Sequence, residues 1–163
     1  QEDIVLHIGG ITKVDKKIIG FPDRRNIIDH GFIDVKSSLF SSLLEQCSFI
    51  ILPSCSEACA TSVTTGMLHG LIPIVMKDAG FNRLGDNAIF LDDYHVEHIA
   101  ERLTEISNYS SEYIKEMSEA AYAFAHRNFT IEAFEKSIAD ILKDITATHD
   151  QSSSLANSPA FLR

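Results

Sequence analysis

The chain alternates short apolar runs with polar segments that contain glycine, asparagine, aspartate or proline. Five runs have the length and the β-branched content of buried strands. These predicted strands are residues 4–8, 30–33, 48–52, 71–76 and 88–91. Strands that alternate with helices need crossover connections, which give a parallel sheet with helices on both faces. The pattern therefore predicts an α/β fold.

Between the strands, residues 38–46 have helical spacing, whereas 11–29 predict a loop with at most a short helix. After the last strand, apolar residues recur every three or four positions in 96–106, 113–124 and 131–145, with Ser110 and Thr130 at N-cap positions. From residue 146 the composition turns to Ser, Thr and Asn, which predicts a flexible tail at 146–163. We expect one domain at 1–145 with a C-terminal helical layer.

Composition excludes several partners. The chain has 163 residues, of which 45% are hydrophobic, so it can bury one sizeable core. Its net charge of −9 argues against nucleic acid, because no basic surface exists to neutralise phosphates. No apolar run has the length of a transmembrane helix, and three cysteines suit a reducing compartment. These features predict a cytoplasmic location, with any membrane association left to a domain outside this chain.

The stretch 50–75, ILPSCSEACATSVTTGMLHGLIPIV, is the most informative. It predicts a buried strand, a polar loop, a helix opened by hydroxyl residues, a glycine turn and a second buried strand. This order puts a helix N-terminus at the carboxyl edge of a parallel sheet. Open α/β sheets bind phosphorylated ligands at such an edge.

The same stretch resembles the C-terminal domain of GT-B glycosyltransferases, most nearly the group 1 or GT4-like retaining enzymes. The matching positions are Pro53-Ser54, Glu57, Gly70, Pro73 and Ile74-Val75. The similarity continues outward at 30–34, 78–80, 85–88 and 128–130, and covers most of residues 4–145. The resemblance implies a Rossmann-like open parallel sheet, the C-terminal half of the GT-B architecture.

The resemblance also implies a function. This domain would bind a nucleotide-diphosphate sugar as donor substrate, with no cofactor and no metal, and a missing N-terminal domain would bind a glycan or lipid-linked acceptor. Glu57 would be the catalytic residue that orients the sugar. The other predicted donor-binding residues are Ser54, Ala58, Cys59, Ala60, Thr61, Ser62, Thr65, Gly31, Phe32, Gly80 and Arg83.

Two departures from the family pattern matter. Thr65 stands where the family has a second glutamate, so a charge-assisted pair of bonds to the ribose diol cannot form in the same way. The first β-α unit, which carries the family's basic pair, is absent. The chain is therefore expected to be an inactive fragment of a hexosyltransferase-type enzyme. The alternatives are a non-catalytic binding module with a decayed donor site, or an epimerase or phosphorylase on the same scaffold.

Other chemistries have weaker support. Cys47, Cys55, Cys59 and His69 are too loosely spaced to predict zinc. The chain has no GxGxxG fingerprint, P-loop or GxSxG elbow. Asp92-Asp93 lacks the intervening residue of a metal-binding DxD motif, and we interpret it as a helix-start cap.

Overall fold

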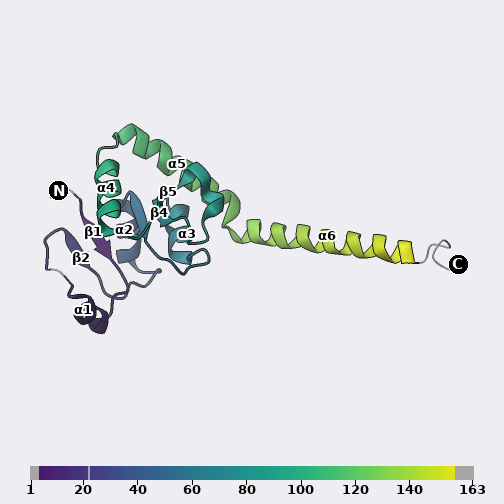
Figure 1. The fold of residues 1–163 in the computed structure, drawn as a ribbon, viewed down its shortest axis with the longest axis horizontal. Coiled ribbons are helices and arrows are strands. Elements are labelled where there is room, and N and C mark those ends of the chain that lie inside the picture. The colour runs from purple at the N-terminus through teal and green to yellow at the C-terminus, as the bar shows by residue number, and fades with distance from the viewer. Residues whose placement is uncertain (1–3, 22, 157–163) are drawn as a thin grey trace. The chain divides into compact units, whose positions relative to one another are not determined.

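The computed structural model describes residues 4–21 and 23–156, which fall into two compact units divided between Tyr122 and Ala123. The first unit contains all five described strands, every pair of them parallel, with helices between them (Figure 1). The predicted α/β class is therefore confirmed.

The first two strands form a small sheet. Strands β1 (Leu6–Ile8) and β2 (Ile27–Asp29) pair in parallel, and α1 (Lys13–Ile19) connects them. The prediction of a strand at 30–33 was wrong, because the chain turns immediately after Asp29. The Asp29 carboxylate accepts a hydrogen bond from the Gly31 N–H, and Gly31 has a φ of +61° that favours glycine.

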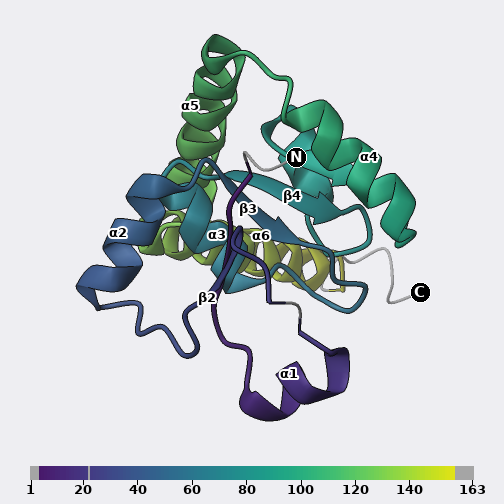
Figure 2. The same ribbon diagram turned by 90° about the vertical axis from the view of Figure 1, so that its left-hand side faces the viewer.

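The second sheet has three parallel strands in the order β3 (Phe49–Leu52), β4 (Ile72–Met76) and β5 (Ile89–Leu91). Helix α2 (Ser38–Gln46) precedes it, and Ser37 caps that helix by accepting a hydrogen bond from the Phe40 N–H. Helix α3 (Thr61–Leu68) connects β3 with β4, and the 3₁₀ segment η1 (Asn82–Asn87) leads to β5 (Figure 2). These positions agree with the strands predicted at 48–52, 71–76 and 88–91.

The core of the first unit is centred on β4, whose five residues are all buried. Helix α3 contributes Val63 and Met67 to this core, and its Gly66 lies against the side chain of Ile50 in β3. A Cβ at Gly66 would lie 3.0 Å from Ile50 Cδ1, so the glycine lets the helix approach the sheet closely. This packing fixes the N-terminus of α3 at the carboxyl edge of β3 and β4.

The strands are arranged differently from the single open sheet that the family resemblance implies. In the part of the chain that the structure describes, β1 pairs with β2 alone and β3 with β4 alone. All four residues of β3 are only half-buried, in contrast to β4. The strands thus form two open parallel sheets, whose outer strands among the described residues are β1 and β2 in one and β3 and β5 in the other.

Three helices follow the last strand, as predicted: α4 (Val96–Ile106), α5 (Ser111–Asn128) and α6 (Ile131–Ala156). The predicted caps are confirmed, since Ser110 accepts a hydrogen bond from the Tyr113 N–H and Thr130 from the Ala133 N–H. Helix α6 continues past residue 145, so the predicted start of the Ser-rich tail lies inside a helix, and 157–163 lie outside the described residues. No helix among the described residues has the length and apolarity to cross a bilayer.

Candidate functional site

The N-terminus of α3 presents free backbone donors. Thr61 and Ser62 are the first two helical residues, as the prediction of a helix opened by hydroxyl residues requires, and the N-cap residue Ala60 forms no side-chain cap. The N–H groups of Val63 and Thr64 bond to the Ala60 carbonyl. Those of Thr61 and Ser62 have no protein acceptor among the described residues. Two donors at the positive end of the helix dipole are therefore available to an anion.

The loop before α3 contacts the loop after β4 through Gly80. A Cβ at Gly80 would lie 2.8 Å from the Cys59 nitrogen and 3.1 Å from Ala58 backbone atoms. Gly80 also has a φ of +74°, and the Cys59 N–H bonds to the Ala79 carbonyl at 3.4 Å. The structure thus brings together three predicted donor residues, but the Cys59 amide donates to protein and is not available to a ligand.

Cys59 has an unusual backbone conformation. Its φ of +78° is the one positive value at a non-glycine position in the described residues. Such strain persists where the surroundings enforce it, and it is concentrated at functional sites. Burial raises the pKa of the Cys59 thiol, so the thiol is protonated at neutral pH and suits neither a nucleophile nor a thiolate metal ligand.

Glu57 lies in the same loop with its side chain exposed. It forms no hydrogen bond or ion pair within the described residues, so its carboxylate is free to accept hydrogen bonds from a ligand. Ser54 is half-buried and accepts a hydrogen bond from the Ser56 N–H at 3.4 Å, which shapes the loop. Thr65 is half-buried on α3, where it offers a neutral hydroxyl.

The sequence analysis missed Tyr94, which follows β5. Desolvation raises the pKa of Tyr94, and the nearby Cys55 and Asp78 raise it further. Cys55 belongs to the loop after β3 and Asp78 to the loop after β4, so Tyr94 lies close to both. The sequence signal that could have identified Tyr94 is its position shortly after the strand predicted at 88–91, at the carboxyl edge where ligands bind.

The predicted residues Gly31 and Phe32 lie at the carboxyl edge of the other sheet. The Phe32 side chain is 88% exposed, immediately after the Gly31 turn. His7 and His30 stack beside this turn, with His7 Nδ1 3.0 Å from His30 Nε2. Within the described part of the chain, no hydrogen bond, ion pair or ring contact joins Phe32 to the Glu57 loop. The predicted residues therefore form two groups, one on each sheet.

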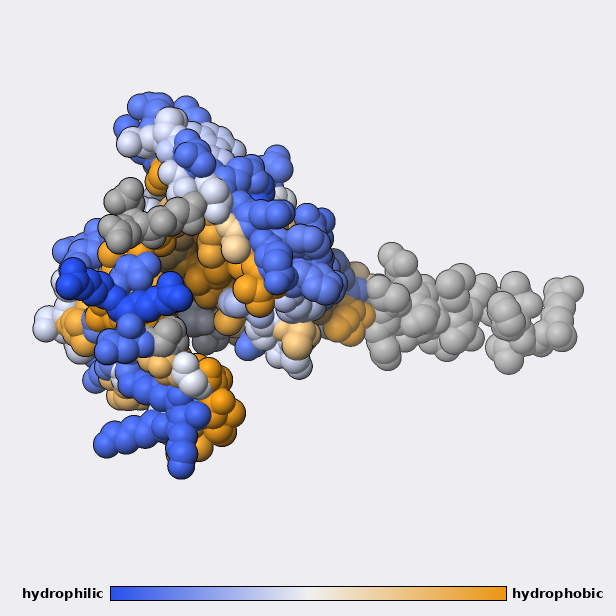
Figure 3. Space-filling model, turned by 60° about the vertical axis from the view of Figure 1, so that its left-hand side comes forward, coloured by the Kyte–Doolittle hydropathy of each residue, from blue (hydrophilic) through white to orange (hydrophobic). Residues whose placement is uncertain are grey.

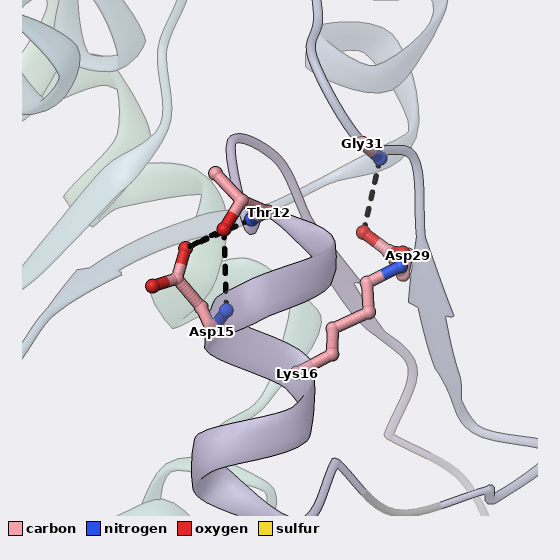
Figure 4. Close-up of polar contacts among 5 residues, drawn as sticks. All are labelled: Thr12, Asp15, Lys16, Asp29 and Gly31. Carbon is pink, nitrogen blue, oxygen red and sulfur yellow. Dashed lines mark hydrogen bonds and ion pairs between the residues drawn. The ribbon is translucent and has the colours of Figure 1, made fainter.

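Asp29 fixes the loop that carries Phe32. Its carboxylate forms an ion pair with Lys16 of α1 and accepts the hydrogen bond from the Gly31 N–H at 3.0 Å (Figure 4). A capping box holds the start of α1, since the Asp15 N–H bonds to Thr12 Oγ1 and the Thr12 N–H to the Asp15 carboxylate. The hydrogen bonds from Thr12 lower the pKa of Asp15.

Arg83, in η1, is exposed and forms no ion pair within the described residues. A separate groove of 670 Å³ lies along β5 and α4. Three charge pairs line it: Lys77 with Asp92, His98 with Asp93, and Arg102 with Glu105. It contains none of the predicted donor-binding residues, so it is distinct from the candidate site.

The described residues contain no group of three or more His, Cys, Asp or Glu side chains placed to hold a metal ion. Asp93 instead accepts hydrogen bonds from His98 and from the His95 N–H, where α4 begins. The interpretation of Asp92-Asp93 as a helix-start cap was wrong, because the N-cap residue of α4 is His95 and that helix has no side-chain cap.

No protein-family model and no curated protein matches the chain. Solved structures, in contrast, match the chain in fold. Anabaena Alr3699/HepE in complex with UDP-glucose matches with a TM-score of 0.67 and 16% identity, over 86% of this chain and 41% of HepE. HepE in complex with UDP matches with a TM-score of 0.64 over the same shares. The chain thus has the fold of part of HepE and spans about two fifths of its length.

Proposed function

We propose that this chain is the nucleotide-sugar-binding part of a glycosyltransferase that transfers a hexose-type sugar to a glycan or lipid-linked acceptor. The main support is the start of α3, where the Thr61 and Ser62 N–H groups have no acceptor among the described residues, and the preceding loop, which carries the exposed Glu57. The fold shared with HepE, whose structure contains UDP-glucose, agrees with this ligand class. Because HepE is more than twice as long, the acceptor site belongs to polypeptide outside the 163 residues.

The diphosphate of the donor binds at the start of α3. Its oxygens accept hydrogen bonds from the Thr61 and Ser62 N–H groups, and the helix dipole stabilises the negative charge that grows on the leaving group. These donors act without a metal ion. Arg83 is the one cation among the predicted donor-binding residues, and it adds charge where residues 80–83 close over the sugar.

Glu57 accepts hydrogen bonds from hydroxyl groups of the donor sugar. A charge-assisted bond of this kind both holds the sugar and selects its hydroxyl pattern. At the other sheet, the exposed Phe32 ring offers a face on which a nucleobase can stack. The chain by itself therefore binds donor but does not transfer sugar.

One observation favours the second candidate, a binding module without catalysis. Thr65 replaces the acid that would bind the ribose diol, and its hydroxyl supports fewer and weaker bonds. If the site had decayed at Glu57 as well, the module would bind UDP-glucose no better than UDP. The sugar's contribution to affinity therefore separates the two functions.

The test compares UDP-glucose with UDP as ligands of the 163-residue chain, by NMR titration, which detects millimolar affinities. Glu57→Gln is expected to weaken UDP-glucose binding about tenfold, from roughly 1.5 kcal/mol of charge-assisted hydrogen bonding, and to leave UDP binding unchanged. Glu45→Gln, at an exposed acid of α2, is the matched control. Equal affinities of wild type and Glu57→Gln for UDP-glucose would contradict the role of Glu57.

A further inference from the structure

Helix α1 presents an apolar face to solvent. Val14 is 66% exposed and Ile18 76% exposed. Residues four apart lie on one face of a helix, so Val14 and Ile18 share a face, and Lys16, midway between them in sequence, lies on the opposite face. Lys16 forms its ion pair with Asp29 of β2, which turns that opposite face toward the small sheet (Figure 4). The usual amphipathic arrangement, with the apolar face covered by the protein, is therefore reversed in α1.

The helix also projects from the rest of the first unit. None of its seven residues is buried, and Ile19 at its end is 60% exposed. Figures 1 and 2 both place α1 at the margin of the unit, away from the three-stranded sheet. In Figure 3 the lobe below the body of the molecule, which contains α1, has hydrophilic surface on one side and a hydrophobic patch on the other. A flat partner could therefore reach the apolar face of α1.

The segment that carries this face is basic, although the chain as a whole is acidic. Residues 13–25 contain five Lys and Arg residues and two Asp residues, a net charge of +3, whereas the whole chain has −9 and the other 150 residues therefore have −12. Lys13, Lys17, Arg24 and Arg25 are exposed, and none of them forms an ion pair within the described part of the chain. Lys13 and Lys17, four positions apart, flank the face formed by Val14 and Ile18.

Aliphatic side chains flanked by cations suit one partner best, a bilayer that contains anionic phospholipid. Its headgroup phosphates attract the cations, its acyl layer accepts the aliphatic side chains, and lysine stems can lie along the boundary between the two. Nucleic acid offers phosphates but no apolar layer for Val14 and Ile18. A second copy of the chain would present the same positive segment, and the two segments would repel each other.

We propose that α1, together with Arg24 and Arg25, is a reversible docking surface for bilayers that contain anionic phospholipid. Val14 and Ile18 enter the boundary between headgroups and acyl chains, and the four unpaired cations contact phosphates. The negative charge of the other residues is repelled by the same lipids and so confines the contact to this segment. The inference rests on the exposure and charge of α1 and not on the proposed function.

Vesicle binding tests the electrostatic part of the proposal. The 163-residue chain should co-sediment with phosphatidylcholine vesicles that contain about one third phosphatidylserine at least about tenfold more tightly than with phosphatidylcholine alone, and added salt should weaken binding. Lys17→Gln should weaken it about fivefold, the contribution of one cation near the surface. Lys136→Gln, at an exposed lysine of α6, is the matched control and should change nothing. No binding to the anionic vesicles, or equal effects of the two variants, would overturn the proposal.

A fluorescent probe tests whether the apolar face enters the bilayer. The chain has no tryptophan, so Ile18→Trp supplies a single fluorophore whose emission should shift to the blue when anionic vesicles are added. Val96→Trp, at a position of α4 that is 73% exposed, should show no shift. An unshifted emission of Ile18→Trp, or equal shifts of the two variants, would contradict insertion of α1.

A double variant separates the bilayer from other polyanions. Val14→Ala with Ile18→Ala removes exposed side chains, so the fold should persist by circular dichroism, while affinity for the anionic vesicles should fall about tenfold. An unchanged affinity would indicate a contact with phosphates alone, of the kind that nucleic acid offers, and would overturn the assignment to a bilayer. These measurements use no nucleotide sugar, so their failure is distinguishable from failure of the proposed function.

Discussion

The two sheets of the first unit differ in how closely their carboxyl edges are packed. At the three-stranded sheet, Gly80 lies so close to Cys59 and Ala58 that a Cβ would meet backbone at 2.8 Å. At the two-stranded sheet, a Cβ at Gly10 or Gly31 would meet nothing within 4 Å, and one at Gly9 would meet the end of the Ile33 side chain at 2.7 Å and backbone only at 4.0 Å. The first edge is a preorganised site with fixed donors, whereas the second is open and carries an exposed aromatic ring. A ligand that spans both edges would be held in one fixed position at the three-stranded sheet, and would have more conformational freedom at the two-stranded sheet.

The largest expected difference between the sheets is in stability. Ile74→Ala removes a side chain of β4 that is 2% exposed, and should lower the free energy of unfolding by about 2–5 kcal/mol. Ile28→Ala removes a β2 side chain that is 39% exposed, and should cost less than about 1.5 kcal/mol because it leaves no buried cavity. Urea denaturation measures both. Similar losses would show that the two sheets are equally well packed.

The second comparison concerns the two glycine loops. Gly80→Ala should cost about 1–3 kcal/mol, because the new Cβ overlaps the Cys59 backbone and the φ is +74°. Gly10→Ala has a similar φ of +86° but open space around it, so it should cost only the conformational penalty of about 1 kcal/mol. Thermal unfolding of both variants gives the difference. UDP-glucose binding should weaken in Gly80→Ala alone; an unchanged affinity would separate this loop contact from the site.

Much of the three-stranded sheet was predictable from sequence, because runs such as Ile74-Val75 are apolar, β-branched and bounded by turn residues. The placement of β2 was not, since Asp29 and Gly31 turn the chain at the start of the HGFI run (30–33). The sequence also did not predict that α6 continues through the Ser- and Thr-rich residues after 145. Composition gives the average tendency of a segment to be disordered, and it does not show that a helix already formed by the preceding residues can extend into that segment.

The candidate site was predictable in part. Strand, loop and helix order placed Glu57 and Thr61 at a sheet edge. The contact between Gly80 and Cys59 depends on how two loops meet in space, and a positive φ at a cysteine has no signal in sequence. Tyr94 was missed for the same reason, since its proximity to Cys55 and Asp78 exists only after three strands are aligned.

The smallest expected effect is electrostatic and concerns the start of α4, away from both glycine loops. The hydrogen bond between Asp93 and His98 raises the pKa of His98 and lowers the pKa of Asp93. The stabilisation that His98 contributes is present below the ordinary histidine pKa of about 6.5, and it is lost as the pH rises through the raised pKa of His98. The stabilisation that Asp93 contributes is lost as the pH falls through the lowered pKa of Asp93. The pair thus stabilises α4 most between about pH 4 and 6.5.

His98→Gln should remove the part of that pH dependence that comes from His98, and should leave the part that Asp93 keeps through its hydrogen bond from the His95 N–H. Stability at pH 8 should change very little, because both groups are exposed to solvent. The melting temperatures of wild type and His98→Gln, compared across pH 3.5 to 8, measure this pH dependence. A profile of His98→Gln that matched wild type at every pH would show that the pair contributes nothing.

The most direct measurement is a map of backbone amide shifts during titration of the ¹⁵N-labelled chain with UDP-glucose. The largest shifts are predicted at Thr61 and Ser62, whose N–H groups have no acceptor in the described part of the chain, with smaller shifts at Glu57 and Phe32. Shifts centred on the groove between β5 and α4, or no shifts at millimolar ligand, would contradict a diphosphate bound at the N-terminus of α3.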